Sequence, residues 1–210
     1  MNTFFLDRLN SEPHALAFAG QSTPWPVALA DQSANPALDE ALHTHAAAAQ
    51  ALLYPVSAEL LATTGRPVDL FGFEPNPARL GAAAAASASV PGIALTQLGA
   101  LLDAAALGYN PAQAKPVAVL GHSQGVLAVH MVQAICEAGS IDAAAAKIDE
   151  ILAIATLIGV AGTRQARQLG LAARHGEATP MLSVKDITRA QVDALIELSL
   201  IHISEPTRRR

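Results

Sequence analysis

The sequence predicts an α/β fold with a mostly parallel sheet, because short apolar runs alternate with longer stretches of helical periodicity. Two runs are typical of buried parallel strands: residues 14–19 (HALAFA) and residues 117–120 (VAVL), each followed directly by a glycine. Between them, alanine and leucine recur at helical spacing. The chain has 210 residues, of which 51% are hydrophobic, so it can bury one sizeable core.

The other elements follow from periodicity and from glycine and proline breaks. Helices are predicted over 36–62 with an interruption at Pro55, from Pro91 onwards, over 124–138 before Gly139, over 141–157 and, with a capping signal, over 188–197. Loops are predicted at 65–77, 108–116 and 162–180, and a short strand at 181–184.

Charge and cysteine usage exclude several classes of protein. The formal net charge is -5 and only 15% of the residues are charged, with no basic cluster outside the C-terminal tail. This pattern gives no electrostatic footprint for nucleic acid. Cys136 is the single cysteine, which excludes a disulfide framework and favours a reducing, cytoplasmic location.

No leader or membrane span is expected. Asp7, Arg8 and Glu12 interrupt any apolar run at the N-terminus, unlike a secretory signal. The longest weakly polar stretch, residues 81–107, is mostly alanine and is broken by Pro91. A spanning helix needs about 20 strongly apolar residues.

The most informative motif is GHSQG at Gly121–Gly125, between the apolar run at 117–120 and a helical pattern. Strand, GxSxG and helix together form a nucleophile elbow, a sharp turn that exposes the serine side chain. The turn also places Ser123 at a helix N-terminus, where N–H groups favour a developing oxyanion. We therefore predict Ser123 as a catalytic nucleophile; the alternative is a packing turn with a capping serine.

A second element, Ala17–Ser22 (AFAGQS), lies about a hundred residues upstream at the end of the first predicted strand. Alone it is an ordinary turn. Because parallel strands end on the same edge of a sheet, Gln21 and Ser123 can meet there. The backbone N–H groups of Gln21 and Gln124 would then form an oxyanion hole, in which one donor is worth about 3 kcal/mol.

Together these motifs resemble the malonyl/acetyl-transferase family of fatty acid and polyketide synthases, whose members have a GQG-like loop and a GHSxG elbow. Longer strings resemble the N-terminal acetyltransferase domain of actinobacterial type I fatty acid synthases, and the similarity covers most of residues 9–197. Ser22 replaces the usual second glycine of the loop. The strings are FAGQSTPW (18–25), GFEP (72–75), SVPGIALTQ (89–97), GHSQGVLAV (121–129), LIGVAGTRQARQLG (157–170) and TPMLSV (179–184).

The resemblance implies a parallel-sheet, α/β-hydrolase-like acyltransferase core over residues 9–178 and the start of a ferredoxin-like inserted subdomain over 179–197. It implies acetyl transfer from coenzyme A to the phosphopantetheine of an acyl carrier protein domain, with no bound cofactor. The acetyl group would pass through an acyl-Ser123 intermediate. Other synthase domains, and a homo-oligomeric full-length parent, follow from the same likeness.

The resemblance also implies that the catalytic base is a histidine beyond the inserted subdomain and hence absent from this chain. His122 would help to position groups at the site. His175 is the one downstream candidate before residue 198, and its polar loop favours a solvated side chain. Residues 198–210 resemble a translated sequencing adapter, so we expect a truncated domain that is poorly stable and nearly inactive alone.

Two further expectations concern ligands. Malonyl-specific relatives place an arginine about 25 residues after the serine, where it pairs with the substrate carboxylate. Residues 148–155 contain no basic residue, and Asp149 and Glu150 would oppose a carboxylate, so an uncharged acyl group is favoured. His43 and His45 are two residues apart on a predicted helix and would face different sides, so no metal site is expected.

Two other functions stay open. A serine esterase or lipase also uses the elbow, but such enzymes build the oxyanion hole from an HGGG-type loop that this sequence lacks. Gln21 at the end of the first strand favours transfer. The second alternative is a catalytically silent fragment that only scaffolds a larger synthase, with exposed sheet edges and apolar faces.

Overall fold

A computed structural model describes residues 3–20, 25–64, 86–168, 188–191, 193–194 and 197. Contacts divide the chain into two units, Met1–Glu177 and Ala178–Arg210. The first unit contains the following elements: α1 (Thr3–Ser11), β1 (Ala15–Phe18), α2 (Trp25–Ser33), α3 (Pro36–Leu52), η1 (Tyr54–Val56), α4 (Ser57–Thr64), α5 (Ala86–Ala106), α6 (Pro111–Ala114), β2 (Ala118–Gly121), η2 (Ser123–Gly125), α7 (Val126–Ala138) and α8 (Ala145–Gln168).

The two predicted apolar runs form a small parallel sheet. β1 pairs with β2 in a register that places Ala15 opposite Ala118 and Phe18 opposite Gly121. The ladder continues past β2, where the His122 N–H donates to the Phe18 carbonyl at 3.0 Å. The α/β prediction is thus confirmed in part, because the described residues are mostly helical around one two-stranded parallel sheet.

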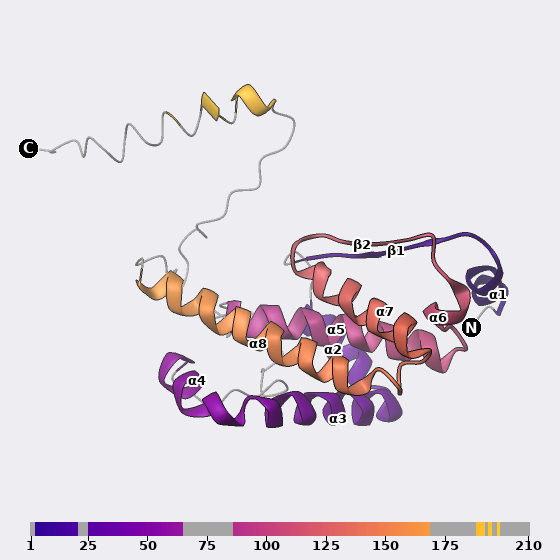
Figure 1. Ribbon diagram of the computed structural model, residues 1–210, viewed down its shortest axis with the longest axis horizontal. Coiled ribbons are helices and arrows are strands. Elements are labelled where there is room, and N and C mark those ends of the chain that lie inside the picture. Colours follow the sequence, from indigo (N-terminus) through magenta and orange to yellow (C-terminus); the bar gives the residue numbers. More distant parts are fainter. Residues whose placement is uncertain are drawn as a thin grey trace, which may run out of the picture. The chain divides into compact units, whose positions relative to one another are not determined.

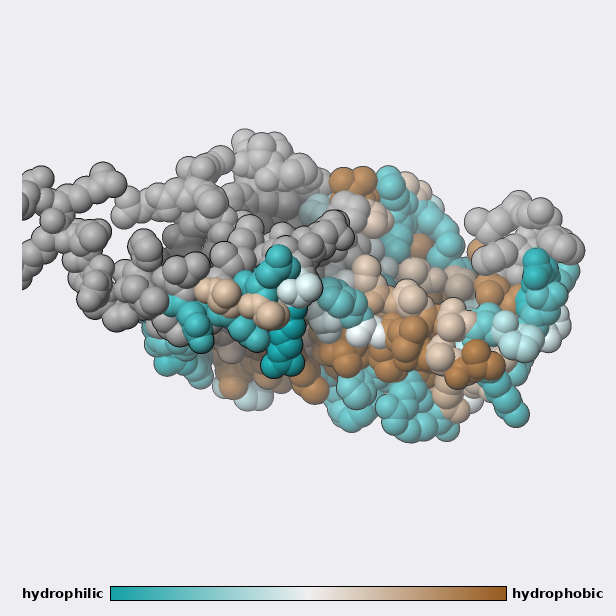
Figure 2. All heavy atoms as spheres, turned by 90° about the horizontal axis from the view of Figure 1, so that it is seen from above, coloured by the Kyte–Doolittle hydropathy of each residue, from teal (hydrophilic) through white to brown (hydrophobic). Residues whose placement is uncertain are grey.

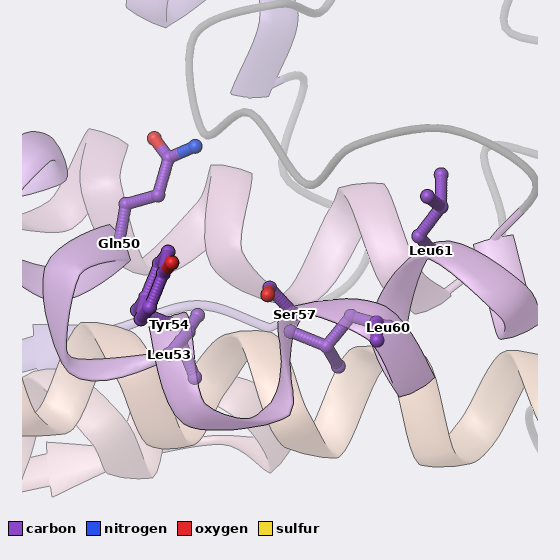
Figure 3. Close-up of a pocket in the computed structure, with 7 residues that line it drawn as sticks. Gln50, Leu53, Tyr54, Ser57, Leu60 and Leu61 are labelled. Atoms are coloured by element: carbon purple, nitrogen blue, oxygen red, sulfur yellow. The ribbon is translucent and has the colours of Figure 1, made fainter.

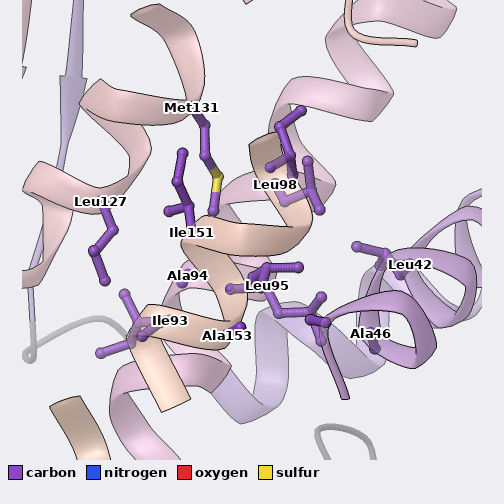
Figure 4. Close-up of a cluster of buried hydrophobic side chains, with 14 of the residues drawn as sticks. Leu42, Ala46, Ile93, Ala94, Leu95, Leu98, Leu127, Met131, Ile151 and Ala153 are labelled. Atoms are coloured by element: carbon purple, nitrogen blue, oxygen red, sulfur yellow. The ribbon is translucent and has the colours of Figure 1, made fainter. Parts of the chain in front are cut away.

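The helices lie in layers beside this sheet. α7 packs against the sheet, α5 and α8 pack against α7, and α3 packs against α5 and α8 (Figure 1). Leu42, Leu95, Leu98 and Met131 are completely buried where these helices meet (Figure 4). Burying a side chain of this size contributes about 1.5–3 kcal/mol each, so the helical layers contain the main apolar core.

The sheet itself is more exposed. Figure 2 turns the upper side of Figure 1 towards the viewer and shows apolar side chains at the surface among polar ones. Val117 and Leu120 are 72% and 60% exposed. Parallel strands in α/β proteins are normally covered on both faces, and among the described elements α7 covers one.

The start of α5 differs from the prediction. The helix begins at Ala86, five residues before the predicted start at Pro91, and the proline lies buried inside it. The early start is stabilised by α8, because the Ser87 N–H donates to the Thr163 hydroxyl at 2.9 Å. A free N–H in the first turn thereby finds a partner that periodicity cannot reveal.

α8 is longer than the predicted helix over 141–157 and continues to Gln168, so the predicted loop from 162 was wrong for residues 162–168. Close packing explains the extension. A Cβ on Gly159 would overlap the Ala86 carbonyl oxygen, and the backbones of α5 and α8 therefore approach closely there. The Arg164 guanidinium also donates to the Glu59 carboxylate of α4 at 3.1 Å.

Three short helices were not predicted. α1 and α2 flank the first strand, and α6 interrupts the predicted loop at 108–116. Asn110 caps α6, since its side-chain oxygen accepts the Ala112 N–H at 2.9 Å and Pro111 follows at the first helical position. The predicted loop at 65–77 lies outside the described residues.

α5 has the length and apolar composition of a membrane-spanning helix, contrary to the expectation that Pro91 breaks this stretch. Of its most apolar window, 72% is buried inside the protein. Core helices of globular proteins have the same composition when other helices surround them.

In the second unit, a helical turn begins after Thr188. The Thr188 N–H donates to the Gln191 side chain at 2.8 Å, and the Gln191 N–H donates to the Thr188 hydroxyl at 3.4 Å. This reciprocal pair is a capping box, as the sequence predicts. The predicted strand at 181–184 lies outside the described residues, and the boundaries 9–178, 179–197 and 198–210 stay predictions.

Candidate active site

The chain turns sharply between β2 and α7. His122 is still extended, with φ -94° and ψ 126°, whereas Ser123 has a left-handed φ of 53°. A non-glycine residue in this region costs about 1–3 kcal/mol and persists only where its surroundings enforce it. Ser123 and His122 are exposed. The turn therefore presents the serine hydroxyl to solvent at the end of the strand, as a nucleophile elbow does.

Both glycines of the motif are required by close packing. A Cβ on Gly121 would lie 2.6 Å from the carbonyl carbon of Gly125 and from the Val126 nitrogen. A Cβ on Gly125 would overlap the Phe18 carbonyl oxygen and lie 2.9 Å from the Ala19 carbonyl oxygen. A side chain at Gly121 would therefore force open the turn between β2 and α7, and one at Gly125 would push the elbow away from β1.

The end of β1 meets the elbow, as the sequence predicts. A Cβ on Gly20 would lie 2.7 Å from the His122 carbonyl oxygen and 2.9 Å from the Ser123 Cβ. Gly20 is buried in this contact. Gln21 lies outside the described residues, so the oxyanion hole from the Gln21 and Gln124 N–H groups stays a prediction.

The local electrostatics favour a negative charge at Ser123. Ser123 is the first residue of η2, and the first N–H groups of a helix have no partner within it. Their partial positive charge stabilises an anion at this end. Gln124 is the next residue, and its side-chain Oε1 is buried without a hydrogen-bond partner among the described residues.

Helix α5 also reaches the site. It packs against η2, and the buried Gln97 donates from Nε2 to the Ala19 carbonyl oxygen at 2.6 Å. Sequence reasoning missed Gln97, although an amide within the apolar pattern of residues 93–101 is a signal that could have indicated it. The elements packed around η2, namely α5, α7 and β2, contain no lysine or arginine.

The acidic residues expected near the substrate have other partners. Asp149 accepts a hydrogen bond from His45 Nδ1 of α3 at 2.6 Å, with both side chains largely buried. Glu150 accepts from Lys147 Nζ at 2.6 Å on the surface of α8. The expectation that these carboxylates oppose a substrate carboxylate is therefore not supported by their placement.

His122 lies beside Ser123 with its ring near Gly20, and His175 lies outside the described residues. In the described part of the chain, no three histidine, cysteine or acidic side chains gather in a way that could hold a metal ion.

Two surface hollows lie elsewhere. One, of about 400 Å³, lies at the junction of α3, η1 and α4 (Figure 3). Another, of about 490 Å³, lies between α4 and α8. Neither is lined by a residue of the elbow. The elbow remains the better candidate because it combines a nucleophile, strained backbone and a helix N-terminus.

A serine held in this turn, with glycines on both sides, is typical of enzymes that form acyl-serine intermediates, whether they hydrolyse or transfer the acyl group. The family model described as "Starter unit:ACP transacylase in aflatoxin biosynthesis" matches residues 74–205, more than half of the chain. The chain belongs to this family of acyltransferases. The match includes the elbow and excludes residues 15–21. No curated protein and no solved structure matches the chain.

Proposed function

We propose that this chain is the nucleophile-bearing part of an acetyl-loading domain, which transfers an acetyl group from coenzyme A to acyl carrier protein through acyl-Ser123. The left-handed backbone of Ser123 is the observation that supports this most directly. It is a costly conformation that exposes a serine hydroxyl at a helix N-terminus, and packing of both glycines enforces it.

The transfer has two steps. In the first, Ser123 Oγ attacks the thioester carbonyl, the new C–O bond forms, the C–S bond breaks, and the serine proton passes through a base to the coenzyme A thiolate. In the second, the phosphopantetheine thiol loses its proton to the base and attacks the ester. The C–O bond breaks and Ser123 recovers its proton. Splitting the transfer this way replaces one difficult step with two easier ones.

The base in this proposal is a histidine outside the chain, with His122 in a positioning role. Among the described residues, no side chain is hydrogen-bonded to Ser123 Oγ, whereas an activated serine usually has a base within about 3 Å. The same proposal includes an α/β-hydrolase-like core, a cytoplasmic type I fatty acid synthase as the parent, and assembly of that parent as an oligomer.

The acyl group is uncharged in this proposal. Around the elbow, α5, α7 and β2 offer no lysine or arginine that could pair with a malonyl carboxylate. Val126, directly after the elbow, and Leu120, directly before it, are apolar and exposed. An acetyl group would meet neither an ion-pair partner nor a strong polar competitor on these elements.

The test is covalent labelling. The 210-residue chain, and the same chain extended along its parent gene, are incubated with radiolabelled acetyl-CoA and malonyl-CoA, and mass spectrometry locates the adduct. We expect acetyl label on Ser123, released to the phosphopantetheine of acyl carrier protein, and no label in Ser123→Ala.

Two results would contradict the proposal. Preferential malonyl labelling would contradict transfer of an uncharged acyl group but would still agree with a transferase. Hydrolysis of simple esters by the extended protein, without transfer to acyl carrier protein, would instead establish the esterase alternative, to which the elbow geometry is equally suited.

A further inference from the structure

Residue Ala19 lies between two contacts that fix the end of β1 against the elbow. On one side, the Phe18 carbonyl accepts the His122 N–H at 3.0 Å and presses against Gly125. On the other side, Gly20 packs against the His122 carbonyl and Ser123 Cβ. The orientation of the Ala19 peptide therefore determines how Gly20 approaches Ser123.

The Ala19 carbonyl has a side-chain partner from a distant helix. Gln97, only 7% exposed, reaches from the middle of α5 and donates Nε2–H to this oxygen at 2.6 Å. The two residues are 78 positions apart in the sequence. The α5 backbone is rigid here because Ile93, Leu95 and Leu98 are completely buried around the glutamine.

A buried glutamine is expensive in an apolar helix. Gln97 Oε1 is buried without a hydrogen-bond partner among the described residues. An unsatisfied buried polar atom costs about 1–3 kcal/mol, and leucine or methionine would fill the position without that cost. Burial of an amide that satisfies only one of its two polar atoms therefore indicates a specific need for its N–H donor at Ala19.

We propose that Gln97 is a positioning residue for acyl transfer: its amide fixes the Ala19 carbonyl, and through it Gly20, against the Ser123 elbow. This inference rests on the proposed function. Gln97 is not expected to touch the acyl group, and it acts through the backbone that follows β1. A displacement of about 1 Å at such a site can reduce a rate about 100-fold.

The chain contains a matched control on the same turn of α5. Gln32 of α2 donates its Nε2–H to the Thr96 carbonyl at 2.9 Å, and its Oε1 is likewise buried without a partner among the described residues. Thr96 directly precedes Gln97 in the sequence. Gln32→Met therefore removes an equivalent glutamine-to-carbonyl hydrogen bond that does not involve β1 or the elbow.

The experiment compares Gln97→Met, Gln97→Leu and Gln32→Met in whichever form of the protein, the 210-residue chain or its extension, acquires acetyl label. We measure the single-turnover rate of Ser123 acetylation, the acetyl-CoA concentration giving half-maximal rate, the melting temperature, and amide hydrogen exchange of residues 15–20. Gln97→Leu removes the donor with a different apolar shape, so it serves if the methionine variant fails to fold.

We expect both Gln97 variants to acetylate Ser123 at least about tenfold more slowly, with half-saturation within about twofold of the unmodified protein. Hydrogen exchange of residues 15–20 should accelerate. The melting temperature of Gln32→Met should fall as far as that of Gln97→Met, but its acetylation rate should stay unchanged. A purely structural role would lower the melting temperature of both glutamine variants and leave acetylation unchanged in both.

Two outcomes overturn the inference. Acetylation of Ser123 at the unmodified rate in Gln97→Met refutes the role of Gln97 but leaves the proposed function intact. The same follows if Gln32→Met loses as much acetylation rate as Gln97→Met. If the unmodified protein takes up no acyl group on Ser123, the proposed function fails first, and the role of Gln97 falls with it. Acetylation of the unmodified protein therefore distinguishes failure of the proposed function from failure of the role of Gln97.

Discussion

The two ends of α7 both have a residue with left-handed backbone, but the residue types and their surroundings differ. Each end has a residue in the left-handed region, Ser123 with φ 53° before the helix and Gly139 with φ 88° after it. Gly139 ends the helix as glycines commonly do, with its N–H on the Ile135 carbonyl and open space where a Cβ would be. Ser123 has a side chain and crowded neighbours.

The difference indicates where the chain stores strain. A glycine at position 123 would adopt this conformation at almost no cost, so a serine there sacrifices stability for its hydroxyl. Backbone strain of this kind is typically found at functional sites. The C-terminal end has no such feature, and its glycine serves only to stop the helix.

The largest expected effect comes from removing the hydroxyl. Ser123→Ala and Ser123→Gly should each reduce acetyl transfer at least about 1,000-fold, which corresponds to about 4 kcal/mol of transition-state stabilisation. Ser123→Gly should also raise the free energy of unfolding above that of Ser123→Ala by about 1 kcal/mol, because glycine tolerates the left-handed backbone. Urea denaturation measures the difference, and equal stability of the two variants would contradict strain at the elbow.

The next largest effect is expected at Gly125. In Gly125→Ala, the new Cβ would collide with the carbonyl groups of Phe18 and Ala19, so the elbow must move away from β1. We expect a loss of about 1–3 kcal/mol in unfolding free energy and about 100-fold in acetyl transfer. Transfer at the normal rate would mean that the contact with β1 is unimportant for catalysis.

Gly139→Ala is the matched substitution at the other end of α7. The new Cβ would meet nothing within 4 Å, so only the left-handed backbone opposes it. The expected cost is about 1 kcal/mol in unfolding free energy, with acetyl transfer unchanged in rate. A catalytic loss as large as that of Gly125→Ala would show that general destabilisation, not local contact, decides activity.

The smallest effect concerns Cys136, a second nucleophile near the C-terminal end of α7. Partial burial raises the pKa of this thiol above its ordinary value, and the neighbouring Glu137 carboxylate raises it further by a smaller amount. The thiolate fraction at a given pH is therefore smaller than in free cysteine, and iodoacetamide should react more slowly. Its rate should rise as the pH increases towards the raised pKa.

Glu137→Gln provides the control for this thiol. Removing the neighbouring negative charge should lower the pKa of Cys136 and make alkylation a few-fold faster at pH 8. Rapid alkylation of the unmodified protein at neutral pH would mean that the thiol is activated. That result would contradict the raised pKa of Cys136.

Local patterns explain which parts of the fold could be predicted. The runs at 14–19 and 117–120 are strongly apolar and end at glycines, and both form strands in the expected parallel pair. The elbow was predictable because a sharp turn with a nucleophile needs particular residue types at fixed spacing. The end of α7 was predictable for a similar local reason, because a glycine such as Gly139 commonly ends a helix.

Contacts between distant segments explain what the sequence could not reveal. α5 begins at Ala86 because Thr163 caps it from another helix, and α8 extends to Gln168 along close glycine contacts with α5. The link from Gln97 to Ala19 likewise depends on the packing of α5 against the elbow. The cap and the glycine contacts have no sequence pattern of their own, whereas an amide within an apolar helix marks Gln97 but does not reveal its partner Ala19.

The register of the sheet has a consequence for synthesis of the protein. Ala15 pairs with Ala118, so β1 leaves the ribosome about a hundred residues before its partner strand. At about 5–20 residues per second, β1 waits roughly 5–20 s without a partner. Helices that lie between the two strands in the sequence can form during that time, but the elbow cannot adopt its strained shape until the sheet closes. The Ser123 geometry therefore forms only after the helices between the two strands have been synthesised, and a chaperone that shields β1 would act within this interval.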